Sequence, residues 1–252
     1  MQNQVEIANT FSSIDLQQLT KVDFDGRIDT KFIFHQDHLP AFLHSIKQDA
    51  VILEVAGKRL FPYRNIYFDT AEFKYFGYHQ AGRATRLKLR ARAYNINGPF
   101  VFEVKRKTNK GLTVKKRLSL PNFDRAVSPE TEAFLQSELG FGFNELPKQV
   151  VVNYSRMTFA NRAMTEKFTL DIGLETKLNG EPLPFHNLVI AEVKQEKFSN
   201  RSVFVKNLKA LRIYPHSFSK YCGAVMKINQ EIKKNRFKPI LRKLEKIEHG
   251  II

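Results

Sequence analysis

Residues 86–94 place a basic residue at every second position, which strongly restricts the local fold. The basic members of this segment are Arg86, Lys88, Arg90 and Arg92, and leucine or alanine fills each gap between them. Successive side chains of a β-strand point to opposite faces, so a strand here would carry four cations on one face and apolar groups on the other. Four like charges within about 20 Å repel one another. A polyanion lying along the row would offset that cost.

The whole chain shares this excess of positive charge, with a formal net charge of +16 over 252 residues. Such a balance predicts attraction to nucleic acid, an anionic membrane or a phosphorylated substrate, against the plainer alternative of a basic protein kept soluble by its charge. Cys222 is the single cysteine, which excludes an intrachain disulfide and a cysteine-based zinc site. No apolar run approaches the roughly 20 residues of a membrane span, and the first residues lack the features of a signal peptide. We therefore expect a cytoplasmic protein.

Strand-like segments dominate the rest of the chain. We expect strands over residues 27–34, 63–69, 83–94, 100–107, 112–120, 149–159, 165–174 and 187–195. Helices are expected over 38–48, 70–78, 128–139, 200–211 and 217–233. This content predicts an α+β fold in which an antiparallel sheet closes into a barrel with flanking helices.

Residues 233–252 form a basic tail in which Pro239 is expected to interrupt any helix. A solvated tail fits this composition best. The tail also fits an anionic membrane surface, an acidic partner or a membrane-protein partner, which would place the protein at the inner face of a membrane.

Several of the expected strands have one charged and one apolar face. Lys115 and Arg117 share a face in one strand, and Glu192 and Lys194 share a face in another. In most antiparallel sheets the apolar face is buried inside and the charges face water. The rarer alternative, with charges facing an inner tunnel, is favoured by the mixture of many cations with single carboxylates. Cations bind phosphate oxygens and carboxylates bind divalent metals, which are the parts of a phosphoryl-transfer site.

These segments resemble the VTC domain, the polyphosphate polymerase module of the triphosphate tunnel family. The resemblance extends from about Phe24 to Ile232, and it separates a tunnel domain over 24–232 from an N-terminal extension over 1–23. The matching motifs are Arg27-Ile-Asp-Thr-Lys31-Phe, Tyr67-Phe-Asp-Thr70, Arg90-Ala-Arg92-Ala-Tyr94, Phe102-Glu-Val-Lys105, Val114-Lys-Lys-Arg117, Tyr154-Ser-Arg156, Thr169-Leu-Asp171, Ala191-Glu-Val-Lys194 and Phe218-Ser-Lys-Tyr221.

The resemblance implies an antiparallel barrel with an inward basic lining that transfers the γ-phosphoryl group of ATP to a growing polyphosphate chain. A divalent metal, manganese or else magnesium, would assist the transfer. The implied partners are ATP and inorganic polyphosphate, and nucleic acid is disfavoured because the strand over 86–92 carries no aromatic residue.

The predicted site follows from the motifs together with the charged strand faces. The residues expected to act in catalysis are Arg90, Arg92, Lys105, Arg156 and Lys220. The residues expected to bind phosphate are Lys31, Lys88, Lys115, Lys116, Lys167 and Lys194, and the motif does not decide between Lys115 and Lys116. Glu192 is the expected metal ligand. Asp171 is expected to hold an arginine rather than a metal, and Tyr67 and Asp69 are expected to position the sheet.

Two positions depart from the family pattern. Lys167 replaces a common arginine and so loses the bidentate fork, and Ser217 replaces a residue that is often basic. Two rival functions remain open: a triphosphate hydrolase of the same fold, and a non-catalytic module that binds polyphosphate or RNA. The strand at Arg27-Ile-Asp-Thr-Lys31 lacks the Glu-x-Glu-x-Lys pattern that such hydrolases tend to carry, which favours chain binding over hydrolysis.

Overall fold

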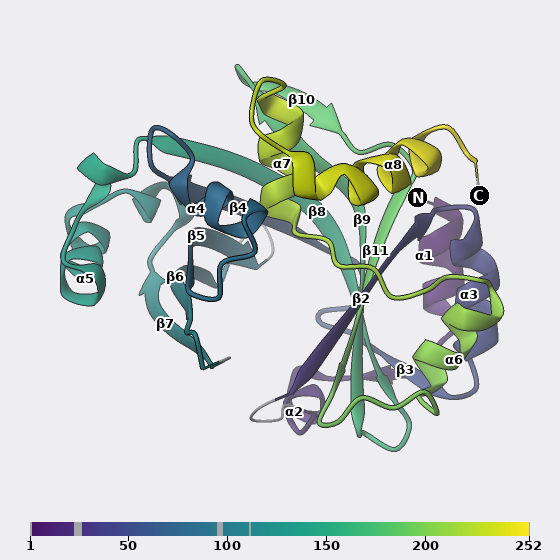
Figure 1. Ribbon diagram of the computed structural model, residues 1–252. Helices are drawn as coiled ribbons and strands as arrows, with labels where there is room; N and C mark the ends of the chain where they lie inside the picture. The colour runs from purple at the N-terminus through teal and green to yellow at the C-terminus, as the bar shows by residue number, and fades with distance from the viewer. Residues whose placement is uncertain (1, 23–26, 95–97, 111, 252) are drawn as a thin grey trace.

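The fold is built on one large, strongly curled antiparallel sheet, seen in a computed structural model that describes residues 2–22, 27–94, 98–110 and 112–251 (Figure 1). Hydrogen-bonded neighbours along the sheet run in the order β2-β11-β9-β8-β4-β5-β6-β7. Their bounds are β2 Ile28–His35, β11 Leu188–Gln195, β9 Glu166–Leu178, β8 Lys148–Asn161, β4 Phe61–Asp69, β5 Arg86–Tyr94, β6 Phe100–Lys107 and β7 Thr113–Leu120. The predicted α+β class and the eight predicted strands are confirmed.

Several shorter elements extend this sheet and were not expected from the sequence. Strand β1 (Ser13–Ile14) pairs in parallel with β3 (Ala50–Leu53), and β3 pairs with β8. Strand β10 (Glu181–Pro184) returns beside β9 as a hairpin. Helices α1 (Gln2–Asn9) and α2 (Leu16–Thr20) occupy part of the predicted N-terminal extension. The predicted domain boundary at residue 24 lies outside the described residues.

The sheet curls but does not close, so the expectation of a closed barrel is wrong. In the described part of the chain, β2 is hydrogen-bonded to β11 and β7 to β6, and neither has a strand on its other edge. Lys31 of β2 and Lys115 of β7 lie on these two end strands. Like charges on edge strands oppose edge-to-edge pairing, and the backbone N–H of His216 donates to the carbonyl of Lys31 at 2.7 Å, so the segment before α7 contacts β2 instead.

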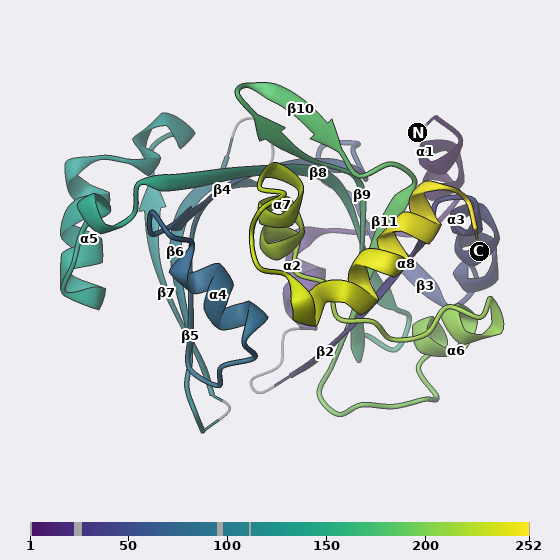
Figure 2. The same cartoon turned by 45° about the horizontal axis from the view of Figure 1, so that its top comes forward.

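The apolar strand faces point outward and are covered by helices. On one side, α1, α3 (His38–Ile46) and α6 (Val203–Ala210) pack on the sheet, where Phe42 and Phe204 meet Phe168 in one buried cluster (Figures 1 and 2). On the other side, α5 (Pro129–Leu139) buries Leu135 against Phe102. The charged faces are therefore turned inward, which confirms the rarer of the two arrangements.

Helix α7 (Lys220–Ile228) lies on the concave side of the sheet instead (Figure 2). Tyr221 and Val225 pack with Val152 of β8 and Ile190 of β11 in a buried cluster, and α4 (Lys74–Gln80) contributes Phe76 to it. Apolar side chains thus fill one part of the concavity. The charged residues occupy the remainder.

The basic tail contains a helix, so the expectation that Pro239 would interrupt one is wrong. Helix α8 runs over Lys238–Glu248 with the proline in its first turn, where the missing N–H has no helical partner to lose. Ile240 and Ile247 are buried in the cluster of α7. The tail is therefore packed on the domain rather than fully solvated. No helix among the described residues is long and apolar enough to cross a membrane.

Several helix boundaries also differ from expectation, and α4 begins at Lys74 rather than at residue 70. Helix α7 ends at Ile228, short of the predicted 233, and Ser202 rather than Asn200 caps α6 by accepting a hydrogen bond from the N–H of Val205. Short 3-10 turns complete the described elements, at Phe123–Ala126, Phe143–Glu145 and Asn235–Phe237.

Candidate functional site

Strands β5, β6 and β7 align three lysines in register on the concave face. Lys88 lies opposite Lys105, and Lys105 lies opposite Lys115. Residues directly opposite each other in a sheet point to the same side, about 5 Å apart. We call these three residues the lysine row. Lys88 donates a hydrogen bond to Oγ of Ser219 at 3.3 Å, and no member of the row has a carboxylate partner in the part of the chain that the structure describes.

The same register separates Lys115 from Lys116, which the sequence could not do. Lys116 lies opposite Val104, whose side chain is buried in the outer cluster beneath α5. Its ammonium group therefore belongs to the outer face of the sheet. Of the two predicted phosphate ligands, the structure brings Lys115 to the other cations and leaves Lys116 away from them.

One carboxylate in the same three strands holds two arginines. Nη2 of Arg90 lies 2.8 Å from Oε1 of Glu103, and Nε of Arg117 donates to Oε2 of Glu103 at 2.9 Å. Burial alone would raise the pKa of Glu103, but the two arginines lower it, so the carboxylate stays ionised. Arg117 was not among the predicted site residues. Its spacing of two from Lys115 was the signal that could have identified it.

Arg92 is fixed by neutral partners and is almost fully buried. Its Nε donates to Oδ1 of Asn65 at 2.7 Å, and its Nη2 donates to the hydroxyl of Tyr154 at 3.2 Å. Nδ2 of Asn65 donates in turn to the carbonyl of Val152 at 2.9 Å. Nothing in the sequence marks Asn65, because its role depends on strand pairing between distant segments.

Asp171 joins two further predicted cations from different elements. Arg156 of β8 binds it through two hydrogen bonds of 2.6 and 2.8 Å, and Nζ of Lys220, the first residue of α7, lies 2.5 Å away. Burial would raise the pKa of Asp171, but Arg156 and Lys220 hold it at about 2. The expectation that Asp171 holds an arginine is confirmed. We call Arg156, Asp171 and Lys220 the Asp171 cluster.

Glu192 lies between two predicted phosphate ligands near the β2 edge. Its carboxylate is 3.9 Å from Nζ of Lys31 and also contacts Nζ of Lys194. Lys194 lies opposite Lys167 in the pairing of β11 with β9, which brings the predicted lysines of these strands together. Burial would raise the pKa of Glu192, but Lys194 and Lys31 lower it strongly. Glu192 is therefore an ionised carboxylate among cations.

The surroundings of Glu192 decide what kind of metal site it could form. In the described part of the chain, no three His, Cys, Asp or Glu side chains gather as metal ligands. Thr169, directly opposite Glu192, has a buried hydroxyl without a hydrogen-bond partner among the described residues. One carboxylate suits a divalent ion that keeps several waters and is held largely by substrate phosphates. The residues fit a metal that arrives with a triphosphate, and they do not form a cage of their own.

The concentration of cations shifts the titration of several groups on this face. Burial and the nearby Lys88 and Lys115 lower the pKa of Lys105 to about 8. Burial would raise the pKa of Tyr67, but Arg90 and Lys88 outweigh it and lower the value to about 8. Burial and Lys88 lower the pKa of His79 to about 3. The nearby cations contribute to all three shifts, and for Tyr67 they outweigh burial, which indicates a positive potential at this face.

Asp69 stabilises the contact of β4 with helices α4 and α7. Its carboxylate accepts hydrogen bonds from the backbone N–H of Thr70 at 2.7 Å and of Tyr75 and Phe76 at 2.9 Å, and it also accepts the hydroxyl of Tyr221. These bonds join β4 to α4 and α7. The expectation that Asp69 positions the sheet is confirmed.

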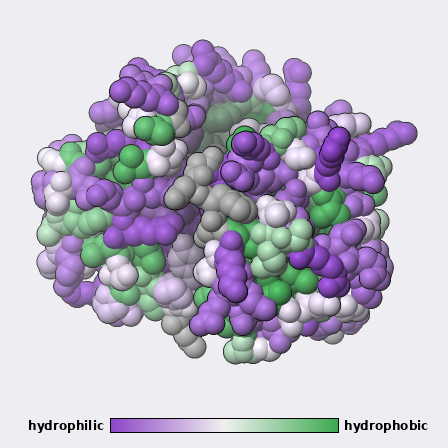
Figure 3. Space-filling view, turned by 90° about the horizontal axis from the view of Figure 1, so that it is seen from below, coloured by the Kyte–Doolittle hydropathy of each residue, from purple (hydrophilic) through white to green (hydrophobic). Residues whose placement is uncertain are grey.

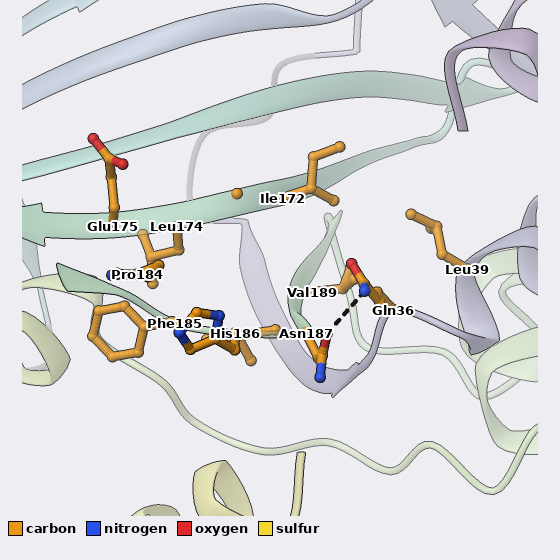
Figure 4. A pocket seen from close by; sticks show the side chains of 12 residues that line it. Gln36, Leu39, Ile172, Leu174, Glu175, Pro184, Phe185, His186, Asn187 and Val189 are labelled. Carbon is orange, nitrogen blue, oxygen red and sulfur yellow. Dashed lines mark hydrogen bonds between the residues drawn. The ribbon is translucent and has the colours of Figure 1, made fainter. Parts of the chain in front are cut away.

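Viewed from below, hydrophilic side chains cover much of the surface of the molecule (Figure 3). A pocket of about 340 Å³ lies beside β9, next to the segment that joins β10 to β11 and to the start of α3. Its lining includes Gln36, Ile172 and Phe185 (Figure 4). No lysine or arginine lines it, so the cationic face is the better candidate for a polyanion.

Comparisons with solved structures find several likenesses of low sequence identity. A protein of Bacillus halodurans described as a candidate adenylate cyclase is 18% identical, covers 77% of this chain and 96% of its own, and has a TM-score of 0.47. A candidate adenylyl cyclase of Hippeastrum, described as having a dominant triphosphatase activity, is 14% identical, covers 77% and 93%, and has a TM-score of 0.47. A protein of Pyrococcus horikoshii is 13% identical, covers 82% and 99%, and has a TM-score of 0.42.

The match to a family is more direct than these structural likenesses. No curated protein matches the sequence. Residues 26–229 match the VTC domain, which is well over half of the chain and contains every predicted site residue. The chain therefore belongs to the VTC domain family.

Proposed function

We propose that this protein is a polyphosphate polymerase that transfers the γ-phosphoryl group of ATP to the end of an inorganic polyphosphate chain. Membership of the VTC family and the inward cationic face support a function on triphosphates or polyphosphates. The observation that carries the proposal is the lysine row, three aligned cations that no protein carboxylate neutralises within the described residues. A polyanion supplies the missing charge.

Two kinds of cation would divide the work. Arg90, Arg117 and Arg156 are held in fixed orientations by Glu103 and Asp171, so they can bind non-bridging oxygens with little loss of side-chain entropy. Nε of Arg90 is buried without a hydrogen-bond partner among the described residues, which leaves a donor for such an oxygen. The lysine row would bind the chain as a line of point charges.

The reaction itself needs little covalent chemistry from the protein. The attacking group is a terminal phosphate oxygen that is already ionised at neutral pH, so no general base is required. It would form a bond to the γ-phosphorus of ATP while the bond from that phosphorus to the bridging oxygen breaks and ADP leaves. Catalysis would depend on in-line positioning and on neutralising the charge of the transferred phosphoryl group. Arg156 and Lys220, joined by Asp171, are placed to do this on one side of the site, and Arg90 on the other.

A divalent metal, manganese or magnesium, would be held by Glu192 together with phosphate oxygens. When bound, it would supply further charge neutralisation. Lys31 and Lys194 keep the Glu192 carboxylate ionised and ready to bind it. Lys167 and Ser217 remain departures from the family pattern, and weaker binding of phosphate is the cost that we expect from them.

The test is incubation of the purified protein with ATP and manganese, with products resolved on a polyphosphate gel. We expect a ladder of long chains that is lost in Glu192→Gln and in Arg90→Ala and retained in Lys116→Ala, the control on the outer face. Free phosphate without a ladder would overturn the polymerase in favour of a hydrolase. Polyphosphate binding without any turnover of ATP would leave a binding module.

A further inference from the structure

A second, smaller pocket lies where α4, the start of β5, α7 and the C-terminal segment meet, beside the lysine row. Its volume is about 130 Å³, and its polar lining consists of His79, Arg86, Ser217 and Ser219, with Cys222 beside them. No Asp or Glu lines it among the described residues. Sites for drug-sized ligands begin at about 300 Å³, so this pocket is too small for a nucleotide and suits a small ion. We call it the Arg86 pocket.

Two cations of β5 act on this pocket. Arg86 precedes Lys88 by two residues and so points to the same face of the strand. Nζ of Lys88 lies 3.3 Å from Oγ of Ser219, which lines the pocket and caps α7. Burial, Lys88 and Arg86 lower the pKa of His79, so both cations lie near the same lining residue. The potential in the pocket is therefore positive.

The pocket contains hydrogen-bond donors that the protein itself does not use. Within the described part of the chain, the guanidinium of Arg86 has no hydrogen bond or ion pair, and Nε2 of His79 is buried without a partner. With a pKa of about 3, the ring of His79 is neutral at pH 7 and can carry its N–H at Nε2. Ser217 is exposed, so solvent reaches its hydroxyl. These donors, without a protein anion, suit a phosphate group.

One wall of the pocket comes from the C-terminal segment, which lies beyond the residues 26–229 that match the family. Phe237 and Ile240 of this segment line the pocket. Arg236 holds the segment in place, because its Nη1 donates to the carbonyl of Ala81 at the end of α4. The enclosed form of the pocket is therefore a property of this chain rather than of the matched domain alone.

Deepening the proposed function, on which this inference rests, we propose that the Arg86 pocket binds a single phosphate group, either inorganic phosphate or the terminal group of a polyphosphate chain. Arg86 offers its planar fork to two oxygens, and His79 and Ser217 donate to the others. The lysine row holds the adjacent part of a chain. The pocket thus recognises an end group, whereas the row recognises charge along the chain.

The first test is calorimetric titration of the full-length protein with inorganic phosphate at pH 7 and constant ionic strength, without ATP or metal. Arg86→Met should raise the dissociation constant about tenfold, the effect of one charge-assisted contact. Arg106→Met is the matched control, because it removes the same charge from the outer face of β6, and it should change the constant by less than about twofold. A larger loss from Lys105→Met than from Arg86→Met would place phosphate on the lysine row and overturn the inference.

A second variant guards against a loss of fold. Ser217→Asp places a carboxylate at an exposed position of the pocket wall and should also weaken phosphate binding, because it repels the anion. Equal melting temperatures of the wild type and both pocket variants show that the effect is on binding. Unchanged phosphate binding in Ser217→Asp would contradict the placement of the anion beside this residue.

A further titration separates the two sources of the phosphate group. Linear polyphosphate with free ends is compared with the same chain blocked at both ends as biotin amides. If the pocket binds chain ends, the free chain binds the wild type more tightly than the blocked chain, and Arg86→Met removes the difference. If Arg86→Met alters neither this difference nor phosphate binding, the inference is overturned. The polyphosphate gel tests the proposed function separately, because a protein that forms no ladder can still bind phosphate through Arg86.

Discussion

The Asp171 cluster and the lysine row are two cationic parts of one concave face that differ in how their charge is balanced. In the cluster, Arg156 and Lys220 share a buried carboxylate at distances of 2.5 to 2.8 Å. In the row, Lys105 lies between two other lysines and has no carboxylate partner among the described residues. The first part is partly neutralised by the protein itself, because two cations share one carboxylate. The second part retains its charge for a ligand.

This difference separates cations that a protein carboxylate holds in fixed positions from cations that only a bound ligand can neutralise. A cation held by a carboxylate is fixed in place and contributes to the stability of the folded protein. An unpaired cation beside others of like sign destabilises the folded protein and becomes favourable when an anion binds. The two parts should therefore respond to substitution with opposite signs in stability.

The largest effect is expected from Asp171→Asn. The change leaves Arg156 and Lys220 buried without their counter-ion, and breaking a buried pair in this way typically costs about 3 to 5 kcal/mol. The free energy of unfolding from denaturant titration measures it. The exposed pair of Arg125 and Glu130 is the control, because solvent screens it and Glu130→Gln should change stability little. Equal effects of the two substitutions would contradict the role of the Asp171 cluster.

Next in size is Lys105→Met, which keeps much of the side-chain volume and removes the charge. Affinity for polyphosphate should fall by about tenfold, the equivalent of one charge-assisted contact of about 1.4 kcal/mol. The free energy of unfolding at pH 7 should stay the same or rise, because repulsion from Lys88 and Lys115 is relieved. Calorimetric titration and denaturant unfolding give the two values. A loss of stability together with unchanged affinity would place Lys105 in the fold rather than in the site.

How far the sequence predicts these two cationic parts depends on whether the contacts that form them are local or distant in the chain. Alternation along one strand is local, and it predicts correctly which residues of β5 share a face. It leaves open which face points inward, and the mixture of cations with single carboxylates and the family resemblance favoured the correct arrangement. Register between strands is not local, so the choice between Lys115 and Lys116 and the role of Asn65 could not be made. Closure of the barrel also failed, because it depends on whether β2 and β7, strands about 80 residues apart in the chain, pair with each other.

Prediction of helices from the sequence has the same limit, because only local signals can be recognised. The cap at Ser128 and the proline after it predict the start of α5 correctly, because a cap is a local signal. Helix α8 was missed because Pro239 was interpreted as a break rather than as a first-turn residue. Its helix depends on burial of Ile240 and Ile247 against α7, which the local sequence does not reveal.

A pH titration of polyphosphate binding also distinguishes the lysine row from the Asp171 cluster, and its expected effect on affinity is smaller. The pKa of Lys105 is lowered to about 8, so the free protein loses this positive charge as the pH rises through about 8. A bound polyanion favours the protonated amine, so binding should take up protons near pH 8, and affinity should fall between pH 7 and pH 9 by up to about the tenfold of Lys105→Met. Ionisation of Tyr67, whose pKa is also about 8, acts in the same direction.

Proton uptake is measured by calorimetric titration at pH 8 in two buffers with different ionisation enthalpies. Lys105→Met is the control and should lose much of the uptake. Asp171 should contribute none, because with its pKa of about 2 it stays ionised throughout this range. Binding that releases protons at pH 8 would contradict the charge state assigned to the lysine row.

The smallest effect tests the register on which the lysine row depends. Lys115→Ala and Lys116→Ala remove the same charge from adjacent exposed positions of β7, but only Lys115 is opposite Lys105. Because Lys115 is exposed and screened by solvent, its loss should weaken polyphosphate binding by about threefold, and the loss of Lys116 should change it little. A salt titration supports the assignment if the difference between the two variants shrinks as ionic strength rises. Equal effects would mean that net charge attracts the chain, and the alignment of lysines across β5, β6 and β7 would then have no part in binding.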